Sequence, residues 1–231
     1  MKTIGLLGGL TWESTLEYYR LINEHVRDTL GGLHSAKLLL YSLDFAEIEH
    51  LQQTNEREKI PQLLIHGAKA LKAGSADFLV ICANTMHKYA PEVLAAVDLP
   101  LVHIADVTGE AVAAAGVQRV GLLGTKYTME EDFYKQRLAD KFGLEVLIPP
   151  EADRQLVHQV IFRELSLGVI RDESRGEYLR IIDELVQRGA QAIILGCTEI
   201  GLLVKQVDTP HRLFDTTVLH AVAAAERSVE G

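Results

Sequence analysis

The two cysteines of the chain both follow a run of apolar residues. Cys82 lies in "LVICANTMH" and Cys197 lies in "AIILGCTEI". Each run predicts a buried strand, and the carboxyl ends of parallel strands are where such proteins bind ligands. A thiol at a strand end can act as a nucleophile or as an acid and base, if its surroundings adjust its pKa. We therefore expect chemistry at residues 82–85, the CANT loop, and at residues 196–199, the GCTE loop.

The two cysteines differ in setting. Cys197 lies between Gly196 and Thr198, where the next helix would begin, and a helix N-terminus lowers the pKa of a thiol. Cys82 comes directly after Ile81, so burial as a small apolar residue is the simpler expectation for it. A cysteine and histidine metal site has no support, because the chain contains neither CxxC nor HxxxH.

Two glycine-containing segments each follow a predicted strand and open a helix. In "GLLGGLTWEST" the backbone amides around Gly9 could hold a carboxylate or a phosphate, with Thr11 or Ser14 as the helix cap. In "GLLGTKYTMEEDFY" the hydroxyls of Thr125 and Thr128 are available, and Thr128 with Glu131 predicts a capping box. Neither segment is GxGxxG, so a dinucleotide fingerprint is absent. The plainer alternative is that the threonines only cap helices.

Other polar side chains are less informative. His87, in the first turn after the CANT loop, is either a local acid or anion contact or, as we expect, a solvent-facing helix residue. We expect Arg163 and Glu164 at the surface, although either could reach a cleft. Further candidates for a pocket, for packing or for meeting an acidic substrate are His103, His220 and Lys126.

Short apolar runs alternate with longer segments of helical period, which is the pattern of an α/β chain with parallel sheets. The predicted strands are 3–7, 37–41, 78–81, 101–103, 119–123, 145–147, 192–195 and 213–214. Apolar residues at spacings of three and four, with glycine at or just beyond the end, predict helices over 12–30, 56–74, 129–143 and 173–189.

The chain repeats itself. "IGLLGG" at 4–9 recurs as "VGLLGT" at 120–125, and the segment that contains Cys82 resembles the one that contains Cys197. Two matches at nearly one offset favour a duplication over chance. We therefore predict two similar α/β domains, residues 1–98 with 212–231 and residues 99–211, with a ligand cleft between them.

The alignment of the halves stays open by one residue. Matching Gly74 to Gly189 places Cys82 opposite Cys197, whereas matching "SAD" to "GAQ" places Ala83 opposite Cys197. A slip of one residue turns a side chain to the other face of a strand. Only one of the two alignments gives two facing thiols.

Composition excludes several classes of protein. The 231 residues are 48% hydrophobic, enough for one substantial core or two smaller ones. The formal net charge of −9 gives no attraction to nucleic acid or to an anionic membrane, so a small molecule is the expected partner. No run is long enough to cross a membrane, and the start of the chain does not resemble a secretory signal. Two cysteines make no disulfide framework, which indicates a reduced, cytoplasmic setting.

Four motifs in order along the chain suggest a family. They are "GLLGG.TWEST", "CANTMH", "LLGT.YTM..DFY" and "GCTEI.LL". Together they resemble the cofactor-independent aspartate/glutamate racemases, the amino-acid racemase branch of the Asp/Glu/hydantoin racemase superfamily. The resemblance implies two Rossmann-like parallel-sheet domains related by pseudo-twofold symmetry and an active site in the interdomain cleft. It also implies a homodimer, an amino-acid substrate, and neither pyridoxal phosphate nor a metal.

A racemase of this kind removes the α-proton from one face of the substrate and returns a proton to the opposite face. One group must be a thiolate base and the other a neutral acid, so their surroundings must hold them in different protonation states. Backbone amides and hydroxyls at the strand ends would stabilise the carbanion. The resemblance makes Cys197 one acid and base, and implies that Asn84, Thr85, Thr125 and Thr198 hold the α-carboxylate and the amino group. We expect the substrate also to meet Gly9, Ala83 and Thr128.

The sequence departs from the family at one position. The usual text is Cys-Asn-Thr, which would place a cysteine where this chain has Ala83, and alanine cannot transfer a proton. The alternatives for that face are Cys82 after a bulge in the loop, Thr85, or a water molecule. A one-sided site with Cys197 alone is a further alternative. It resembles the arylmalonate decarboxylases, which keep only the second cysteine.

Two other classes stay open. A non-catalytic amino-acid binding protein would use the same carboxylate contacts without a reactive thiol. A flavodoxin-like or nucleotide-binding module would bind phosphate at the glycine turns.

Overall fold

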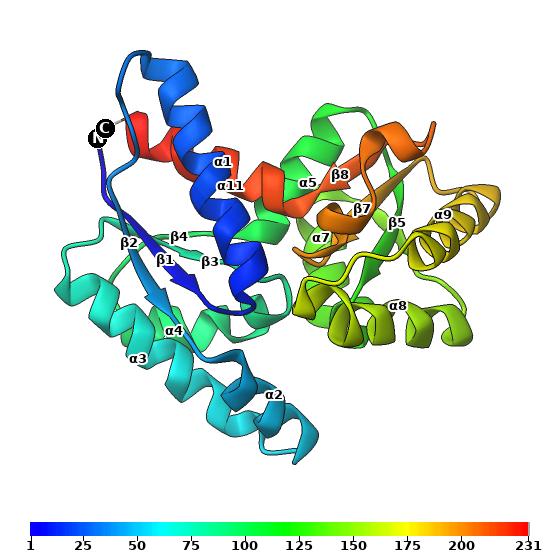
Figure 1. The fold of residues 1–231 in the computed structure, drawn as a ribbon, viewed down its shortest axis with the longest axis horizontal. Coiled ribbons are helices and arrows are strands. Elements are labelled where there is room, and N and C mark those ends of the chain that lie inside the picture. The colour runs from blue at the N-terminus through cyan, green and yellow to red at the C-terminus, as the bar shows by residue number, and fades with distance from the viewer. Residues whose placement is uncertain (231) are drawn as a thin grey trace. The chain divides into compact units, whose positions relative to one another are not determined.

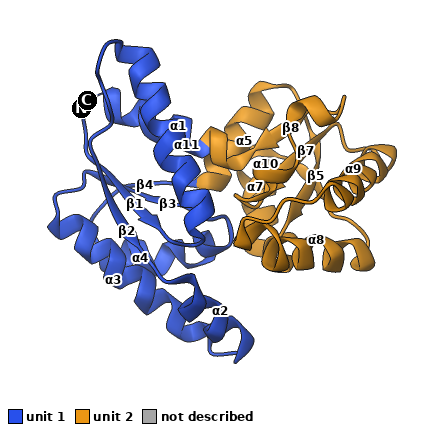
Figure 2. Ribbon diagram, viewed as in Figure 1, with its two compact units in different colours: residues 1–103, 220–231 blue, residues 104–219 orange. Residues whose placement is uncertain are grey.

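The computed structural model describes residues 1–230 and divides the chain into two compact units (Figure 2). Unit 1 contains residues 1–103 and the C-terminal residues from 220 onward, and unit 2 contains residues 104–219. The two crossings lie about five and eight residues later than the domain boundaries predicted at 98/99 and 211/212. The second crossing falls inside the last helix, α11 (Thr216–Val229).

Unit 1 is built on a four-stranded parallel sheet in the order β2-β1-β3-β4 (Figure 1). The central strands β1 and β3 are buried along their whole length, whereas the edge strand β2 is only partly buried. This explains why the central strands are continuous apolar runs. The elements are β1 (Ile4–Gly8), α1 (Trp12–Leu30), β2 (Leu38–Ser42), α2 (Phe45–Gln53), α3 (Ile60–Ala73), β3 (Phe78–Ile81), α4 (Ala90–Ala96) and β4 (Leu101–Val102).

Unit 2 repeats this plan with the strand order β6-β5-β7-β8, again all parallel. Its central strands β5 and β7 pack into a hydrophobic core of their own. The elements are α5 (Ile104–Ala114), β5 (Arg119–Gly124), α6 (Lys126–Glu130), α7 (Asp132–Phe142), β6 (Glu145–Leu147), α8 (Glu151–Arg163), α9 (Asp172–Gln187), β7 (Ala192–Gly196), α10 (Ile200–Leu203) and β8 (Leu213–Asp215). The predicted α/β class with two parallel sheets is therefore confirmed.

All eight predicted strands form, with ends shifted by no more than one residue. The helix predicted over 129–143 is wrong in its first part. Glu131 is extended, with φ −79° and ψ 156°, so it separates α6 from α7. The helix predicted over 56–74 begins as a short 3-10 helix, 57–59, and continues as α3, with Pro61 in its first turn.

The strand pairing decides between the two alignments of the halves. Leu7 of β1 pairs with Ile81 of β3, and Leu123 of β5 pairs with Leu195 of β7. Leu7 and Leu123 occupy the same place in the repeated segments 4–9 and 120–125, so their partners Ile81 and Leu195 correspond to each other. Two residues further along the chain, Ala83 therefore corresponds to Cys197. The alignment that matches Cys82 to Cys197 is wrong.

Candidate active site

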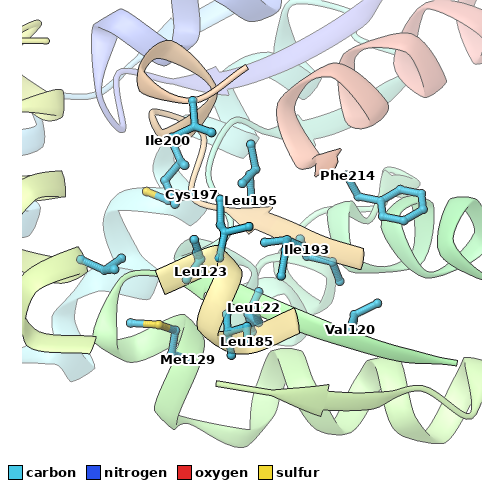
Figure 3. Packing of buried hydrophobic residues seen from close by; sticks show 14 of the residues in the cluster. Val120, Leu122, Leu123, Met129, Leu185, Ile193, Leu195, Cys197, Ile200 and Phe214 are labelled. Carbon is cyan, nitrogen blue, oxygen red and sulfur yellow. The ribbon is translucent and has the colours of Figure 1, made fainter. Parts of the chain in front are cut away.

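Cys197 begins the loop after β7. It packs into the core of unit 2, with 8% of its surface exposed, and Figure 3 shows its side chain among those of Leu195 and Ile200 at the strand end. Its sulfur donates a hydrogen bond to Oε2 of Glu199 at 2.8 Å. The thiol is thus held in place by a carboxylate two residues along the chain.

The surroundings of Cys197 raise the pKa of its thiol well above the ordinary value. Burial is the largest cause, followed by the negative charge of Glu199 and the hydrogen bond to it. Hydrogen bonds with the backbone of Thr198 and Glu199 act in the opposite direction but are weaker. The expected lowering by a helix N-terminus is therefore wrong, because α10 is only four residues long and a buried charge lies nearer. The arrangement favours the neutral thiol, which is a proton donor.

Glu199 is a functional candidate that the sequence analysis missed. It is almost fully buried, and its Oε2 also accepts a hydrogen bond from Oγ1 of Thr198 at 3.1 Å. The signal in the sequence is an acidic residue directly before an apolar helix, because carboxylates are rarely buried without a partner. The carbonyl of Thr198 in turn accepts a hydrogen bond from Oγ1 of Thr217 at 3.2 Å, which fixes the backbone of the GCTE loop.

Thr125 and Thr128 are both buried at the end of β5. Thr125 is the N-cap of α6, and its Oγ1 accepts a hydrogen bond from the amide of Thr128 at 3.3 Å. The predicted capping box of Thr128 with Glu131 is wrong, because Thr128 lies inside α6 and Glu131 precedes α7 without a side-chain cap. The two hydroxyls are 3.3 Å apart, so they form one polar group beside the strand end.

In unit 1, Cys82 and Ala83 occupy different environments. Cys82 is completely buried, its sulfur lies 4.0 Å from the carbonyl oxygen of Val80, and burial raises the pKa of its thiol. Ala83 retains 8% exposure, the same as Cys197. The catalytic role of Cys82 stays a prediction, and both its burial and the strand register favour a site that does without it.

The CANT loop leads into a 3-10 helix, Thr85–Tyr89, with Asn84 as the preceding residue. Asn84 is buried and Thr85 is partly exposed. His87 was expected to face solvent, and this is wrong: its ring is buried, and its Nδ1 lies 2.7 Å from the carbonyl oxygen of Ala83. The imidazole folds back onto the loop that precedes it.

Gly9 lies in the turn between β1 and α1. Its φ of +73° is in the left-handed region, and its N–H donates to Oγ1 of Thr15 at 2.9 Å. Of the two predicted caps, Thr11 is the N-cap of α1 and accepts a hydrogen bond from the amide of Ser14, which lies inside the helix. The backbone N–H groups of Gly9 and Ser14, two of the donors that were expected to be available to an anion, are thus already hydrogen-bonded within the protein.

The remaining candidates are divided between surface and interior. Arg163 and Lys126 are exposed, whereas Glu164 is partly buried and accepts a hydrogen bond from Oγ of Ser174 at 2.6 Å. His103 is partly buried and His220 completely buried.

Within the described part of the chain, no three histidine, cysteine or acidic side chains are grouped so as to hold a metal ion. Nor does any described helix combine the length and apolar character needed to cross a membrane.

Comparison with known proteins gives a consistent result. The model of the Asp/Glu/Hydantoin racemase family matches residues 7–224. The chain is 22% identical to the broad specificity amino-acid racemase RacX of Bacillus subtilis (strain 168), with 93% of this chain and 92% of that protein covered. The solved structure of an aspartate racemase homologue from Pyrococcus horikoshii is 35% identical, with a TM-score of 0.84 over 99% of this chain and all of that one. A candidate Asp/Glu racemase from Yersinia pestis is 51% identical, with a TM-score of 0.90 and the same coverage.

Proposed function

Because the chain belongs to the Asp/Glu/hydantoin racemase family and is an isomerase of the amino-acid racemase type, we propose that it interconverts the enantiomers of aspartate, glutamate or a broader set of amino acids. The substrates are suggested by the relatives, one an aspartate racemase homologue and one of broad specificity. The reaction needs no pyridoxal phosphate in this proposal, and the two free cysteines fit a reducing cytoplasm.

Cys197 is the acid and base on one face of the substrate. In one direction its neutral thiol donates a proton to the α-carbon and becomes a thiolate, and in the other direction the thiolate removes the α-proton. The observation that carries this role is the 2.8 Å hydrogen bond to Glu199, which aligns the thiol and stabilises its protonated form. Glu199 is a positioning residue in this scheme.

The second proton is transferred near the CANT loop. Ala83, the counterpart of Cys197, has no proton to give, so the group is Cys82, Thr85 or a water molecule. Cys82 would have to leave its buried position to reach a substrate, whereas Thr85 is partly exposed. We therefore rank Thr85 or water ahead of Cys82.

The negative charge that develops on the substrate carboxylate needs hydrogen-bond donors. The proposed donors share one feature, a place at or just after the end of a central strand, where polar groups interrupt the core. They are the side chains of Asn84, Thr85, Thr125, Thr128 and Thr198, whereas Gly9 and Ala83 contact the substrate in this proposal without donating, because their N–H groups bond to Thr15 and Ile81. Donors fixed in advance stabilise an enediolate-like carbanion, because they need no reorganisation when the charge appears.

The test is proton NMR of L- and D-aspartate and L- and D-glutamate in deuterium oxide with the protein present. We expect loss of the α-proton signal, and a decrease of at least about a hundredfold in the Cys197→Ala variant, the usual size of an acid–base contribution. Cys82→Ala serves as the matched control. If it abolishes exchange, Cys82 is the second group after all, and if Cys197→Ala keeps full activity, the mechanism is wrong.

A second candidate function is decarboxylation by one thiol. It is favoured by Ala83 at the position that corresponds to Cys197, together with the burial of Cys82. Release of carbon dioxide from a substituted malonate, dependent on Cys197 and accompanied by no exchange from any amino acid, would establish it in place of racemisation.

A further inference from the structure

Unit 1 contains a cluster of four rings, three of them buried, that the proposed chemistry does not use. It joins His87, His103 and His220 with Tyr18 of α1. The ring centroids of His87 and His103 are 4.6 Å apart, and those of His87 and His220 are 5.6 Å apart. Figure 1 shows α1 next to α11, the helix that carries His220.

His220 is fixed in one tautomer by its two hydrogen bonds. Its Nε2 lies 2.8 Å from the carbonyl oxygen of Val102, which can only accept, so Nε2 carries the proton. Its Nδ1 therefore accepts from the hydroxyl of Tyr18, also at 2.8 Å. Burial first, and then the nearby His87, lower the pKa of His220 to about 3, which keeps this ring neutral.

The ring of His87 packs against the ring of His220. The two imidazoles form a T-shaped arrangement, with 64° between their planes. Its Nδ1–H donates to the carbonyl of Ala83, by the same argument from a carbonyl that can only accept. The amide of Ala83 donates to the carbonyl of Ile81, two residues earlier, so the chain turns sharply at this position. Both backbone groups of Ala83 are thereby held.

We propose that His87, supported by the Tyr18–His220 pair, is a positioning residue that holds the Ala83 carbonyl and so fixes the shape of the CANT loop. This inference rests on the proposed function, because the loop is where the second face of the substrate would be served. With no thiol at position 83, that face depends on Thr85 or water, and therefore on where the backbone places them. His87 transfers no proton to the substrate in this scheme.

Two substitutions at one position separate a positioning role from proton transfer. Asparagine can place its amide nitrogen near the position of Nδ1 and donate to Ala83, but it cannot transfer a proton, and leucine can do neither. We expect His87→Leu to lower kcat for α-proton exchange by about tenfold or more with a smaller change in KM, the cost of about one hydrogen bond. His87→Asn should restore exchange to within about fivefold of the wild-type rate. Equal loss in both variants, or no loss in either, would overturn the proposal.

Amide hydrogen exchange of residues 82–85 tests the same inference without a measurement of enzyme activity. His87→Leu should speed exchange in this loop, His87→Asn should do so much less, and Tyr18→Phe should have an intermediate effect. His50→Leu, which replaces an exposed histidine of α2, is the matched control and should leave the loop unchanged. Unaltered protection in His87→Leu would refute the positioning role. If protection changes as expected while the wild type racemises no amino acid, the proposed function fails and the role of His87 in shaping the loop stands.

Discussion

Cys197 and Glu199 are both buried, and the hydrogen bond between them gives each polar side chain a partner in the interior. The carboxylate is nearly excluded from solvent and finds two donors, the thiol and the hydroxyl of Thr198. A carboxylate that is stabilised in this way opposes ionisation of the neighbouring thiol. The pair therefore favours the form of Cys197 in which the sulfur carries the proton.

Replacing Glu199 with glutamine should lower the pKa of Cys197. The amide can still accept a hydrogen bond, but it removes the negative charge that disfavours the thiolate, so more thiolate forms at a given pH. In a Cys82→Ala background, we expect iodoacetamide to label Cys197 about tenfold faster at about pH 8, because the thiolate is the form that reacts. Mass spectrometry of the labelled peptide measures the rate.

Glu164→Gln is the control for this experiment, because Glu164 is a partly buried carboxylate of the same unit that bonds to Ser174. Its labelling rate should match that of the parent. A Glu199→Gln rate equal to or below the parental rate would show that the charge of Glu199 does not govern the thiol.

At the scale of elements, the turn between β1 and α1 depends on Gly9. A Cβ at this position would overlap the backbone carbonyl oxygen and amide nitrogen of Leu43, and neither can move without moving the chain after β2. The positive φ adds a cost that L side chains pay even in open space.

We expect Gly9→Ala to lower the free energy of unfolding by about 3 kcal/mol or more, the range of large steric and backbone effects. Gly143→Ala is the matched control. Gly143 has φ +67° and ψ 22°, in the left-handed region, but nothing lies within 4 Å of its would-be Cβ, so only the backbone cost of about 1 kcal/mol applies. Urea unfolding measures both, and equal losses would show that contact with Leu43 is unimportant.

Helices and strands could be predicted from the sequence where the local pattern of apolar residues alone determines them. Buried central strands such as β3 and β7 are continuous apolar runs, and the apolar period of α1 is visible directly in the sequence, which left Thr11 and Ser14 as alternative caps. The break at Glu131 was not predictable, because a single extended residue interrupts an otherwise helical pattern. His87 was misjudged for a similar reason: its burial depends on His220, far away in the sequence, and no local pattern reports such a contact.

The same limit applied to the site. The two strand ends, and the position of Cys197 directly after one of them, could be predicted from residue type and spacing. The correspondence of Ala83 with Cys197 could not, because it depends on which residues pair between strands. The raised pKa of Cys197 also escaped the sequence, since a neighbouring carboxylate outweighs a short helix.

At the scale of the whole molecule, an apolar stripe on α1 predicts self-association. Trp12, Leu16 and Tyr19 are 66%, 56% and 52% exposed, and their spacing of four and three places them on one face of the helix. Exposed apolar surface of this kind is typical of an interface. We propose that a second copy of the chain covers it, in line with the homodimer that the family resemblance implies.

Leu16→Glu should prevent the proposed dimer from forming, because it places a charge in the proposed interface. Light scattering after size-exclusion chromatography measures the mass. Leu167→Glu changes an equally large leucine that is 66% exposed in unit 2 and should stay dimeric. A monomeric wild type at micromolar concentration, or a dimeric Leu16→Glu variant, would remove α1 as the interface.

The path of α11 has a consequence for the order in which the protein folds during synthesis. Unit 2 is one continuous stretch, 104–219, whereas unit 1 needs the residues from 220 onward, including His220. A nascent chain that folds domain by domain normally completes its N-terminal part first. Here the unit whose synthesis starts first is completed after the other: its sheet strands emerge early, but His220, whose ring packs against His87, follows the whole of unit 2. We therefore expect the CANT loop to take its final shape only after unit 2, which contains Cys197, has been synthesised.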